Sequence, residues 1–281
     1  MCAAILRPTQ ATYTVSENYE VDTEDHEDHT FCGVMFSLEC KRELPVDFIE
    51  VYSISVRGEL GPMTVWVTPD TFLGKNERPD LWEKVYEGNH ESSYGAFTRL
   101  SFPRPVVVAA GTTIGMYVHS KVDGDGGVVY DNQRGHTAHE DTFIGLGPGF
   151  AHLSNKPFSP HGFWGRAWRS RRQFVGRIAY GAKYKLWNPV GAVHHAFPTS
   201  FRRLVRLFLG IKPHQPGCPI STMSNDILFY ILNMCRWDWV PPMLGDEMPQ
   251  LFEEDQELYS LYPRWQYPPN VFFLKLQLNF I

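Results

Sequence analysis

Several short segments contain the residue types that metal binding or catalysis would require. Asp123-Gly-Asp-Gly-Gly combines acids and glycines as calcium loops do, but the position that needs the closing glutamate is Arg134. A tight hairpin is the simpler interpretation. Gly145-Leu-Gly-Pro-Gly has the wrong spacing for a phosphate loop, and its proline lacks an amide that such a loop needs. Because no Gly-x-Ser-x-Gly elbow or Walker loop occurs either, we expect neither catalysis nor a cofactor.

Two histidines lie three residues apart in the polar segment His136-Thr-Ala-His-Glu. Zinc needs three or four convergent ligands, so His119 or Asp141 would have to join His136 and His139. Proximity in the sequence is weak evidence for a ligand set. We therefore predict no resident metal, with a zinc site at these histidines as the alternative.

Arginines accumulate in a region that contains no acid. Between Asp141 and Asp226 there is no aspartate or glutamate, and aromatic residues such as Trp164 and Trp168 alternate with the cations. Arginine beside aromatic rings is typical of contact with RNA, and a basic amphipathic helix also suits an anionic membrane surface. The alternatives are a solvated face or an internal partner for the acidic segment 1–30. The candidate anion-binding residues are Arg166, Arg169, Arg171, Arg172, Arg202, Arg203 and Arg206.

The composition is that of a globular protein. Of 281 residues, 43% are hydrophobic and 20% are charged, and the formal net charge is -5. The isoelectric point of about 6.1 argues against a dedicated nucleic-acid binder. Five cysteines without a CxxC motif indicate a reducing compartment. No signal peptide and no apolar run of about 18 residues is present, so we expect a cytoplasmic protein.

The dominant pattern is alternation of apolar and polar residues, interrupted by glycine and proline. It is clearest from Gly95 to Asn132, where Ile114, Met116 and Val118 alternate with other residues. Short alternating segments separated by turns are typical of antiparallel strands. The sequence therefore predicts a mainly β fold, an antiparallel β-sandwich or jelly roll over residues 31–187, with a short α-helical C-terminal appendage.

The segments outside this region have other patterns. Residues 1–30 become acidic and lack periodicity, which predicts a flexible arm. Residues 188–217 are interpreted as a linker that contains a basic amphipathic helix at 201–209. Ser200 is the expected N-cap of that helix, and Gly210 is its expected end.

A second helix is predicted within residues 218–242, with Ser224 as its N-cap. Its apolar face is formed by Ile227, Leu228, Ile231 and Leu232. Residues 243–281 form an acidic and aromatic tail. We expect this tail to end in a strand, because apolar residues alternate from Val271 to Ile281.

The series of β segments contains three more specific features. Gly33-Val-Met-Phe opens it, an Ala110-Gly turn precedes an alternating strand, and Val129-Tyr-Asp-Asn follows. Over about residues 31–184 the series resembles the PHR domain, a β-sandwich of very large ubiquitin ligases and BTB-type ligase adaptors. The segment 157–172 departs from it by being longer and more basic. The resemblance implies a sandwich whose loops hold a protein partner.

The segment at about 218–240 places a proline, a short turn, an acid and an Ile-Leu helix in succession. In this order it resembles the opening of an F-box, although Met223-Ser224 stands where the motif has Leu-Pro and no clear third helix follows. The resemblance implies docking to a ligase scaffold of the Skp1–cullin type. An amphipathic helix packed on its own domain would show the same pattern. The implied partner-binding residues are Ile227, Leu228, Ile231, Leu232, Trp237 and Trp239.

The absence of catalytic motifs and the two resemblances together imply a non-catalytic protein-binding module and, more specifically, a substrate adaptor of a ubiquitin ligase. One alternative is a phosphate-recognising module that uses the arginines to bind RNA or an anionic membrane. Another is a carbohydrate-binding jelly roll with Trp66, Trp82 or Trp164 as a stacking platform. The adaptor requires an exposed apolar stripe at 227–232, whereas the phosphate-binding function requires the arginines on one face.

Overall fold

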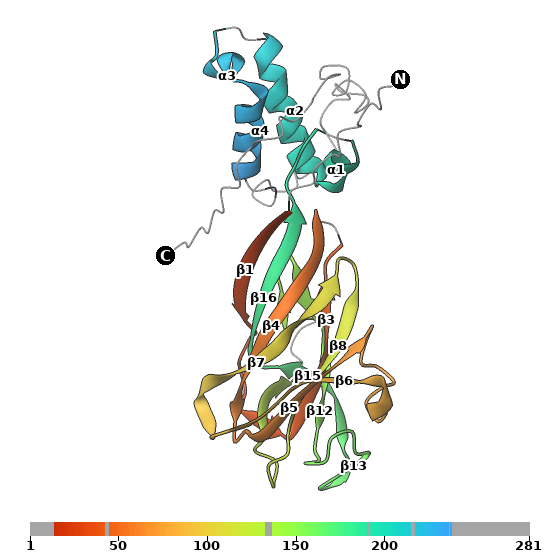
Figure 1. The fold of residues 1–281 in the computed structure, drawn as a ribbon. Helices are drawn as coiled ribbons and strands as arrows, with labels where there is room; N and C mark the ends of the chain where they lie inside the picture. Colours follow the sequence, from red (N-terminus) through yellow and green to blue (C-terminus); the bar gives the residue numbers. More distant parts are fainter. Residues whose placement is uncertain are drawn as a thin grey trace, which may run out of the picture.

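The computed structural model describes residues 14–42, 45–132, 137–189, 191–214, 217–235 and 237. Most of these residues lie in antiparallel strands, and helices follow the last strand (Figure 1). The predicted mainly β fold class with a helical appendage is confirmed. Among the described helices, none is long and apolar enough to cross a membrane.

Four strands form the smaller of the two main sheets, in the order β1-β16-β4-β7. Each neighbouring pair is antiparallel. The strands are β1 (Thr14–Asp22), β4 (Val46–Gly58), β7 (Ser93–Ala109) and β16 (Arg177–Lys185).

The larger sheet has ten strands, ordered β2-β9-β15-β12-β3-β8-β5-β6, with β10 and β11 joined beside β3. Its strands are β2 (His29–Phe31), β3 (Gly33–Cys40), β5 (Gly61–Pro69), β6 (Glu83–His90), β8 (Thr113–Ser120), β9 (Val128–Asn132), β10 (His139–Glu140), β11 (Ile144–Leu146), β12 (Gly149–His152) and β15 (Trp168–Phe174). A separate hairpin pairs β13 (His161–Gly162) with β14 (Gly165–Arg166).

Four helices occupy one end of the molecule, opposite the end that carries β13 (Figure 1). They are α1 (Gly191–Ala196), α2 (Thr199–His214), α3 (Pro219–Thr222) and α4 (Asn225–Met234). A short 3-10 helix spans Pro79–Leu81. The predicted N-cap of α4 is confirmed, because the Ser224 side chain accepts a hydrogen bond from the Ile227 amide.

The alternation along β3 separates two buried clusters. Val34, Phe36 and Leu38 face the main core between the sheets, whereas Met35 belongs to a second cluster. Since successive strand residues point to opposite faces, that second cluster lies on the outer face of the large sheet. Its other buried members are Phe72, Trp82, Tyr117 and Phe158. Both faces of strand β3 are therefore buried, whereas the alternation of apolar and polar residues predicts a strand with only one buried face.

The expected flexible arm at 1–30 is wrong for the described residues 14–30. Strand β1 pairs with β16 along its whole length, and the Asp22 carboxylate accepts two hydrogen bonds from the Arg177 guanidinium. Asp25 and Asp28 both form ion pairs with Arg57. The acids of this segment therefore pair partly with the basic stretch, at Arg177, as the internal-partner alternative expects, and partly outside it, at Arg57 of β4.

The predicted linker and its helix also need correction. Helix α1 lies inside the supposed linker, and α2 continues beyond Gly210 to His214. A glycine inside a helix costs only about 1 kcal/mol relative to alanine, which the packing of the helix can offset. Phe201, Val205 and Leu209 of α2 are buried in the same core as the sandwich.

The segment Asp123-Gly-Asp-Gly-Gly is not a tight hairpin. It joins β8 to β9, which are separated by other strands in the large sheet. The backbone carbonyls of Gly126 and Gly127 accept hydrogen bonds from the amides of Glu59 and Leu60. The segment is therefore a crossing loop, held by the β4–β5 turn.

Candidate functional site

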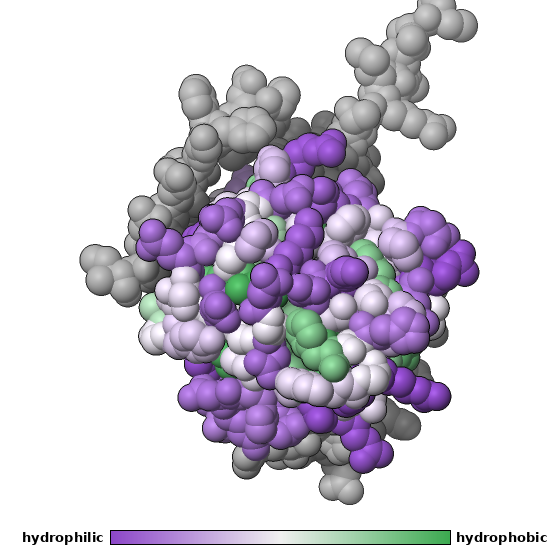
Figure 2. Space-filling view, turned by 90° about the horizontal axis from the view of Figure 1, so that it is seen from below, coloured by the Kyte–Doolittle hydropathy of each residue, from purple (hydrophilic) through white to green (hydrophobic). Residues whose placement is uncertain are grey.

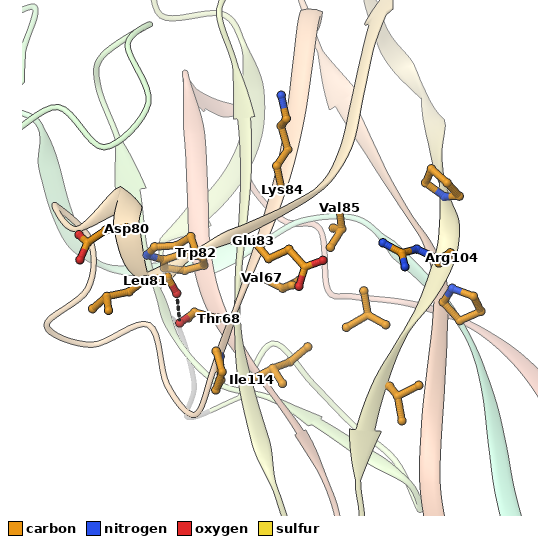
Figure 3. Close-up of a pocket in the computed structure, with 15 residues that line it drawn as sticks. Val67, Thr68, Asp80, Leu81, Trp82, Glu83, Lys84, Val85, Arg104 and Ile114 are labelled. Atoms are coloured by element: carbon orange, nitrogen blue, oxygen red, sulfur yellow. Dashed lines mark hydrogen bonds between the residues drawn. The ribbon is translucent and has the colours of Figure 1, made fainter.

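A groove of about 840 Å³ lies where the last strands of the two sheets separate (Figure 3). Strand β6 is the outermost described strand of the large sheet, and β7 is the outermost described strand of the small one. These strands are consecutive in the chain, so they diverge from their shared turn into different sheets. The groove is the open side of the sandwich at this edge.

The floor of the groove is the margin of the hydrophobic core. Val67, Val85, Val106 and Ile114 line it, and each is only partly buried while packing against the main core. Val107 adds an apolar side chain that is 57% exposed. The core of the sandwich is therefore not fully covered at this edge.

One wall of the groove is held by side-chain hydrogen bonds to the backbone. The Thr68 hydroxyl donates to the Leu81 carbonyl at 2.7 Å (Figure 3), and the Trp82 indole N–H donates to the Lys75 carbonyl at 2.9 Å. Trp82 is buried, whereas Leu81 is 40% exposed. These bonds fix the segment before β6 and present Leu81 at the rim.

Charged side chains stand on both walls. Asp80 is paired with Arg78 at 2.7 Å, and this bond holds the pKa of the Asp80 carboxyl below its ordinary value. Glu83 and Arg104 stand on opposite walls and both extend into the space between β6 and β7 (Figure 3). Among the described residues, neither side chain has an ion-pair partner.

The sequence patterns did not identify this groove. Its one available signal is Pro103-Arg104-Pro105, because proline in a strand is confined to edges and bulges. The register of β4 and β7 shifts between Val51 and Ser53, next to these prolines. The burial that defines the floor comes from strands far apart in the sequence.

The groove residues suit binding better than bond chemistry. The lining residues include no serine, cysteine or histidine, and the Thr68 hydroxyl is engaged with the backbone. Cys32 and Cys40 are buried in the sandwich, and burial raises the pKa of the Cys32 thiol to about 12 and that of Cys40 to about 11. Both thiols therefore stay protonated at neutral pH.

The predicted docking face of α4 is divided between core and solvent. Leu228 and Leu232 are fully buried in the main core, whereas Ile227 is 50% exposed and Ile231 is partly exposed. Trp237 is buried, with its ring 6.0 Å from Phe143 and 6.2 Å from Tyr184. Trp239 lies outside the described residues. The large apolar side chains exposed on the outside of α4 are Ile227, Tyr230 and Met234.

The candidate anion-binding arginines form two separate groups. Arg202, Arg203 and Arg206 lie on α2 at the helical end, where burial and the other two arginines lower the pKa of Arg206 from its ordinary value. The remaining four lie on β14, in the separate hairpin, and on β15, in the large sheet. The single basic face that the phosphate-binding alternative requires is therefore not formed. Those four are Arg166, Arg169, Arg171 and Arg172.

Two of the three candidate sugar-stacking tryptophans pack in or against the second hydrophobic cluster. Trp82 is buried, whereas Trp66 is partly exposed and meets Phe158 edge to face, with ring centroids 5.3 Å apart. Trp164 is 63% exposed at the tip of the β13–β14 hairpin, beside Phe163. Seen from this end, the surface is mostly hydrophilic with small separate apolar patches (Figure 2).

The candidate metal-binding histidines are only partly described. His139 lies 3.1 Å from the Asp141 carboxylate, and His136 falls outside the described residues. His119, the third candidate ligand, is fully buried, and its Nε2 lies 2.8 Å from the Ser154 carbonyl. Within the described part of the chain, no group of three or more His, Cys, Asp or Glu residues is placed to hold a metal.

No family model matches the chain, and no curated protein matches it. One similar solved structure is that of the Gt strain of infectious bursal disease virus, with 12% sequence identity and a TM-score of 0.21. The match covers 84% of this chain and 59% of that chain. Another is that of T=1 particles derived from infectious bursal virus (13% identity, TM-score 0.18, covering 88% and 59%). This chain thus spans about 59% of the length of these proteins. TM-scores this low carry no argument about function, and the PHR and F-box resemblances stay predictions.

Proposed function

We propose that this chain is a non-catalytic protein-binding module that holds an extended segment of a partner protein in the groove between β6 and β7. The observation that carries the proposal is the open margin of the core, where Val67, Val85 and Val106 remain partly exposed. An apolar side chain placed there would complete the packing. Each Å² of apolar surface removed from water contributes roughly 25 cal/mol.

The backbone of β6 offers a way to hold an extended segment. Its outer edge has no neighbouring strand within the described residues, so its unpaired amides and carbonyls can accept an added strand. On β7, Pro103 and Pro105 lack amide hydrogens and cannot donate to such a strand. A bound segment would therefore pair with β6 and contact β7 through side chains.

The two unpaired charges define the preferred partner. Glu83 and Arg104 stand on opposite walls, so they complement a segment with a basic residue on one side and an acidic residue on the other. Opposite charges across an interface contribute more to specificity and association rate than to affinity. The preferred segment is thus an apolar residue flanked by charges of both signs.

This function is tested by selecting random 12-residue peptides, displayed on phage, on the intact protein. We expect the enriched peptides to share an apolar residue flanked by charged ones. Their affinity, measured by fluorescence anisotropy, should fall at least tenfold for Val107→Asp and for Arg104→Glu. Both replaced residues are exposed, so the variants should fold as the parent does.

The matched control is Phe163→Asp, an exposed apolar residue on the β13–β14 hairpin, outside the groove lining. The enriched peptides should bind this variant with unchanged affinity. Peptides that bind all three variants equally, or a selection that enriches no common pattern, would contradict the groove as the binding site.

A substrate adaptor of a ubiquitin ligase is the more specific form of this proposal. The outer face of α4 supports it, because Ile227, Tyr230 and Met234 are 50%, 59% and 45% exposed. Their spacing places them along one side of the helix, the arrangement that helix-in-groove docking requires. Leu228 and Leu232 cannot take part without leaving the core.

The adaptor function predicts capture of a named scaffold through α4. The intact chain, used as bait in lysate, should retain a cullin of the Skp1–cullin type on immunoblots, and Ile227→Asp should abolish the signal. Leu207→Asp, which replaces a 56% exposed leucine on α2, is the matched control and should keep it. The adaptor function is contradicted if the intact chain retains no cullin. It is also contradicted if Ile227→Asp and Leu207→Asp reduce the cullin signal equally.

A further inference from the structure

A second cavity, of about 380 Å³, opens on the outer face of the large sheet. It shares no lining residue with the groove between β6 and β7. Its walls come from β3, from the segment after β5, from the β11–β12 turn, from the start of β12 and from β15. The lining residues are Ser37, Thr71, Phe72, Leu73, Gly147, Pro148, Gly149, Phe150, Ser170 and Arg171.

Arg171 has an unusual backbone conformation at the rim of this cavity. Its φ is 57°, in the left-handed region that glycine normally occupies. It is the extra residue of a β-bulge, because Gly149 pairs with Arg172 and Phe150 pairs with Ser170. Strained residues of this kind concentrate at ligand-binding sites, where bulges direct a side chain to a particular place.

The charge of Arg171 is available to a ligand. The side chain is exposed and has no hydrogen-bond or ion-pair partner among the described residues. Within the described part of the chain, no acidic residue lines the cavity. The nearest acid along the lining strand β3 is Glu39, two residues beyond Ser37 and outside the lining set. The cavity therefore has a single positive charge.

The other polar groups of the cavity are hydroxyls. The Ser37 and Thr71 hydroxyl oxygens lie 3.1 Å apart, and the Thr71 oxygen accepts a hydrogen bond from the Leu73 amide at 3.2 Å. Ser170 adds an exposed hydroxyl beside Arg171. These groups can donate hydrogen bonds to an oxyanion that the guanidinium holds.

The inner surface is apolar. Phe72 and Phe150 meet edge to face, with ring centroids 5.1 Å apart, and Leu73 and Pro148 add apolar atoms at the rim. This surface suits the carbon skeleton of a small molecule, and the cavity volume lies within the range of small-molecule sites. The cavity thus combines one cation with an apolar floor.

We propose that this cavity binds a small organic monocarboxylate with an aromatic or aliphatic body. The Arg171 fork matches a carboxylate in a bidentate manner, and a single positive charge balances a single negative one. A phosphate monoester carries close to two negative charges and would be only half neutralised. The body of the ligand packs on Phe72 and Phe150.

The test uses the full chain and 3-phenylpropionate as the probe, with binding followed by ligand-observed NMR and calorimetry. We expect 3-phenylpropionate to bind at least tenfold more tightly than its neutral isostere 3-phenylpropanamide, and more tightly than phenyl phosphate. Arg171→Gly should reduce the affinity for the acid at least tenfold while leaving the weak affinity for the amide unchanged. Arg171→Lys keeps the positive charge but loses the planar guanidinium. Its affinity for the acid should lie between those of the parent and Arg171→Gly.

The matched control is Arg166→Gly, an exposed arginine on β14 with ordinary φ, which should bind the acid as the parent does. Glycine adopts the positive φ of position 171 without strain, so Arg171→Gly should fold as the parent does. Equal binding of acid and amide by the parent, no saturable binding of the acid, or unchanged affinity in Arg171→Gly would overturn the proposal. Tighter binding of phenyl phosphate would overturn the assignment to a monocarboxylate.

Discussion

His119 and His152 lie beside Tyr117 on the outer face of the large sheet, and all three side chains are fully buried. The Tyr117 hydroxyl donates to His152 Nδ1 at 2.7 Å, and His152 Nε2 donates to the Ser159 carbonyl at 3.0 Å. His119 Nε2 donates to the Ser154 carbonyl, while its buried Nδ1 has no hydrogen-bond partner among the residues that the structure describes. The neutral form of both rings, with the proton on Nε2, satisfies these contacts.

The stability of the protein should fall as the pH drops below about 6.5. Burial lowers the pKa of His119 to about 3 and that of His152 to about 4, so the unfolded chain binds protons that the folded chain excludes. At pH values between the unfolded-state and folded-state pKa values, each histidine lowers the free energy of unfolding by about 1.4 kcal/mol for every unit that the pH falls. From pH 6 to pH 5 the two histidines together should lower the free energy of unfolding by about 2 kcal/mol, measured by urea denaturation.

His152→Gln should reduce this pH dependence, because glutamine does not titrate. His161→Gln, at an exposed histidine of β13, should leave it unchanged. If the urea midpoints at pH 6 and pH 5 coincide for the parent protein, the two buried imidazoles do not control its stability.

At the scale of single elements, the β3–β12–β15 region depends on close backbone approach. A Cβ atom added to Gly149 would lie 2.0 Å from the Met35 carbonyl oxygen, across the pair that β12 forms with β3. Gly147, two residues earlier in the same turn, has no atom within 4 Å of such a Cβ. The two glycines therefore differ in what a methyl group would displace.

Gly149→Ala should lower the free energy of unfolding by about 1–3 kcal/mol, since the carbonyl it meets belongs to a central strand and can move only with that strand. Gly147→Ala is the matched control and should change stability by no more than about 0.5 kcal/mol. Chemical denaturation of the two variants measures both effects. Equal stability of the variants would show that β12 can shift away from β3.

At the scale of the whole molecule, the helices and the sandwich share one hydrophobic core. Leu228, Phe229 and Leu232 of α4 belong to the same cluster as the strands of both sheets. The Asn233 side chain adds hydrogen bonds to both the amide and the carbonyl of Trp187, which follows β16. The helical end is therefore packed against the sandwich, unlike a domain on a free linker.

A single cooperative unfolding transition is expected, with far- and near-ultraviolet circular dichroism giving the same midpoint. Leu228→Ala should lower the free energy of unfolding by about 2–5 kcal/mol through the cavity it leaves, and should shift both signals together. Ile227→Ala, at the neighbouring exposed position, should change it by no more than about 0.5 kcal/mol. Two separate transitions, or a Leu228→Ala effect on the helical signal alone, would contradict a shared core.

The sequence by itself determined the fold class and many of the elements. Alternation along segments such as Gly33–Cys40 and Thr113–Ser120 specifies strands, because a period of two places apolar residues on one face. The caps and spacing around Ser224 specify a helix in the same local way. These patterns depend on residues within a few positions of one another, so they can be interpreted without the rest of the chain.

Only the tertiary structure decided which surfaces remain available for binding. Leu228 and Ile227 are adjacent apolar residues, yet one is in the core and the other is exposed, because the sandwich covers only one side of α4. Three aspartates near the start of the described chain, Asp22, Asp25 and Asp28, pair with arginines far away in the sequence. The groove and the Arg171 cavity are each lined by segments that are distant in the sequence. Which side chains are exposed or paired, and where the surface is concave, is therefore decided only when those segments pack together.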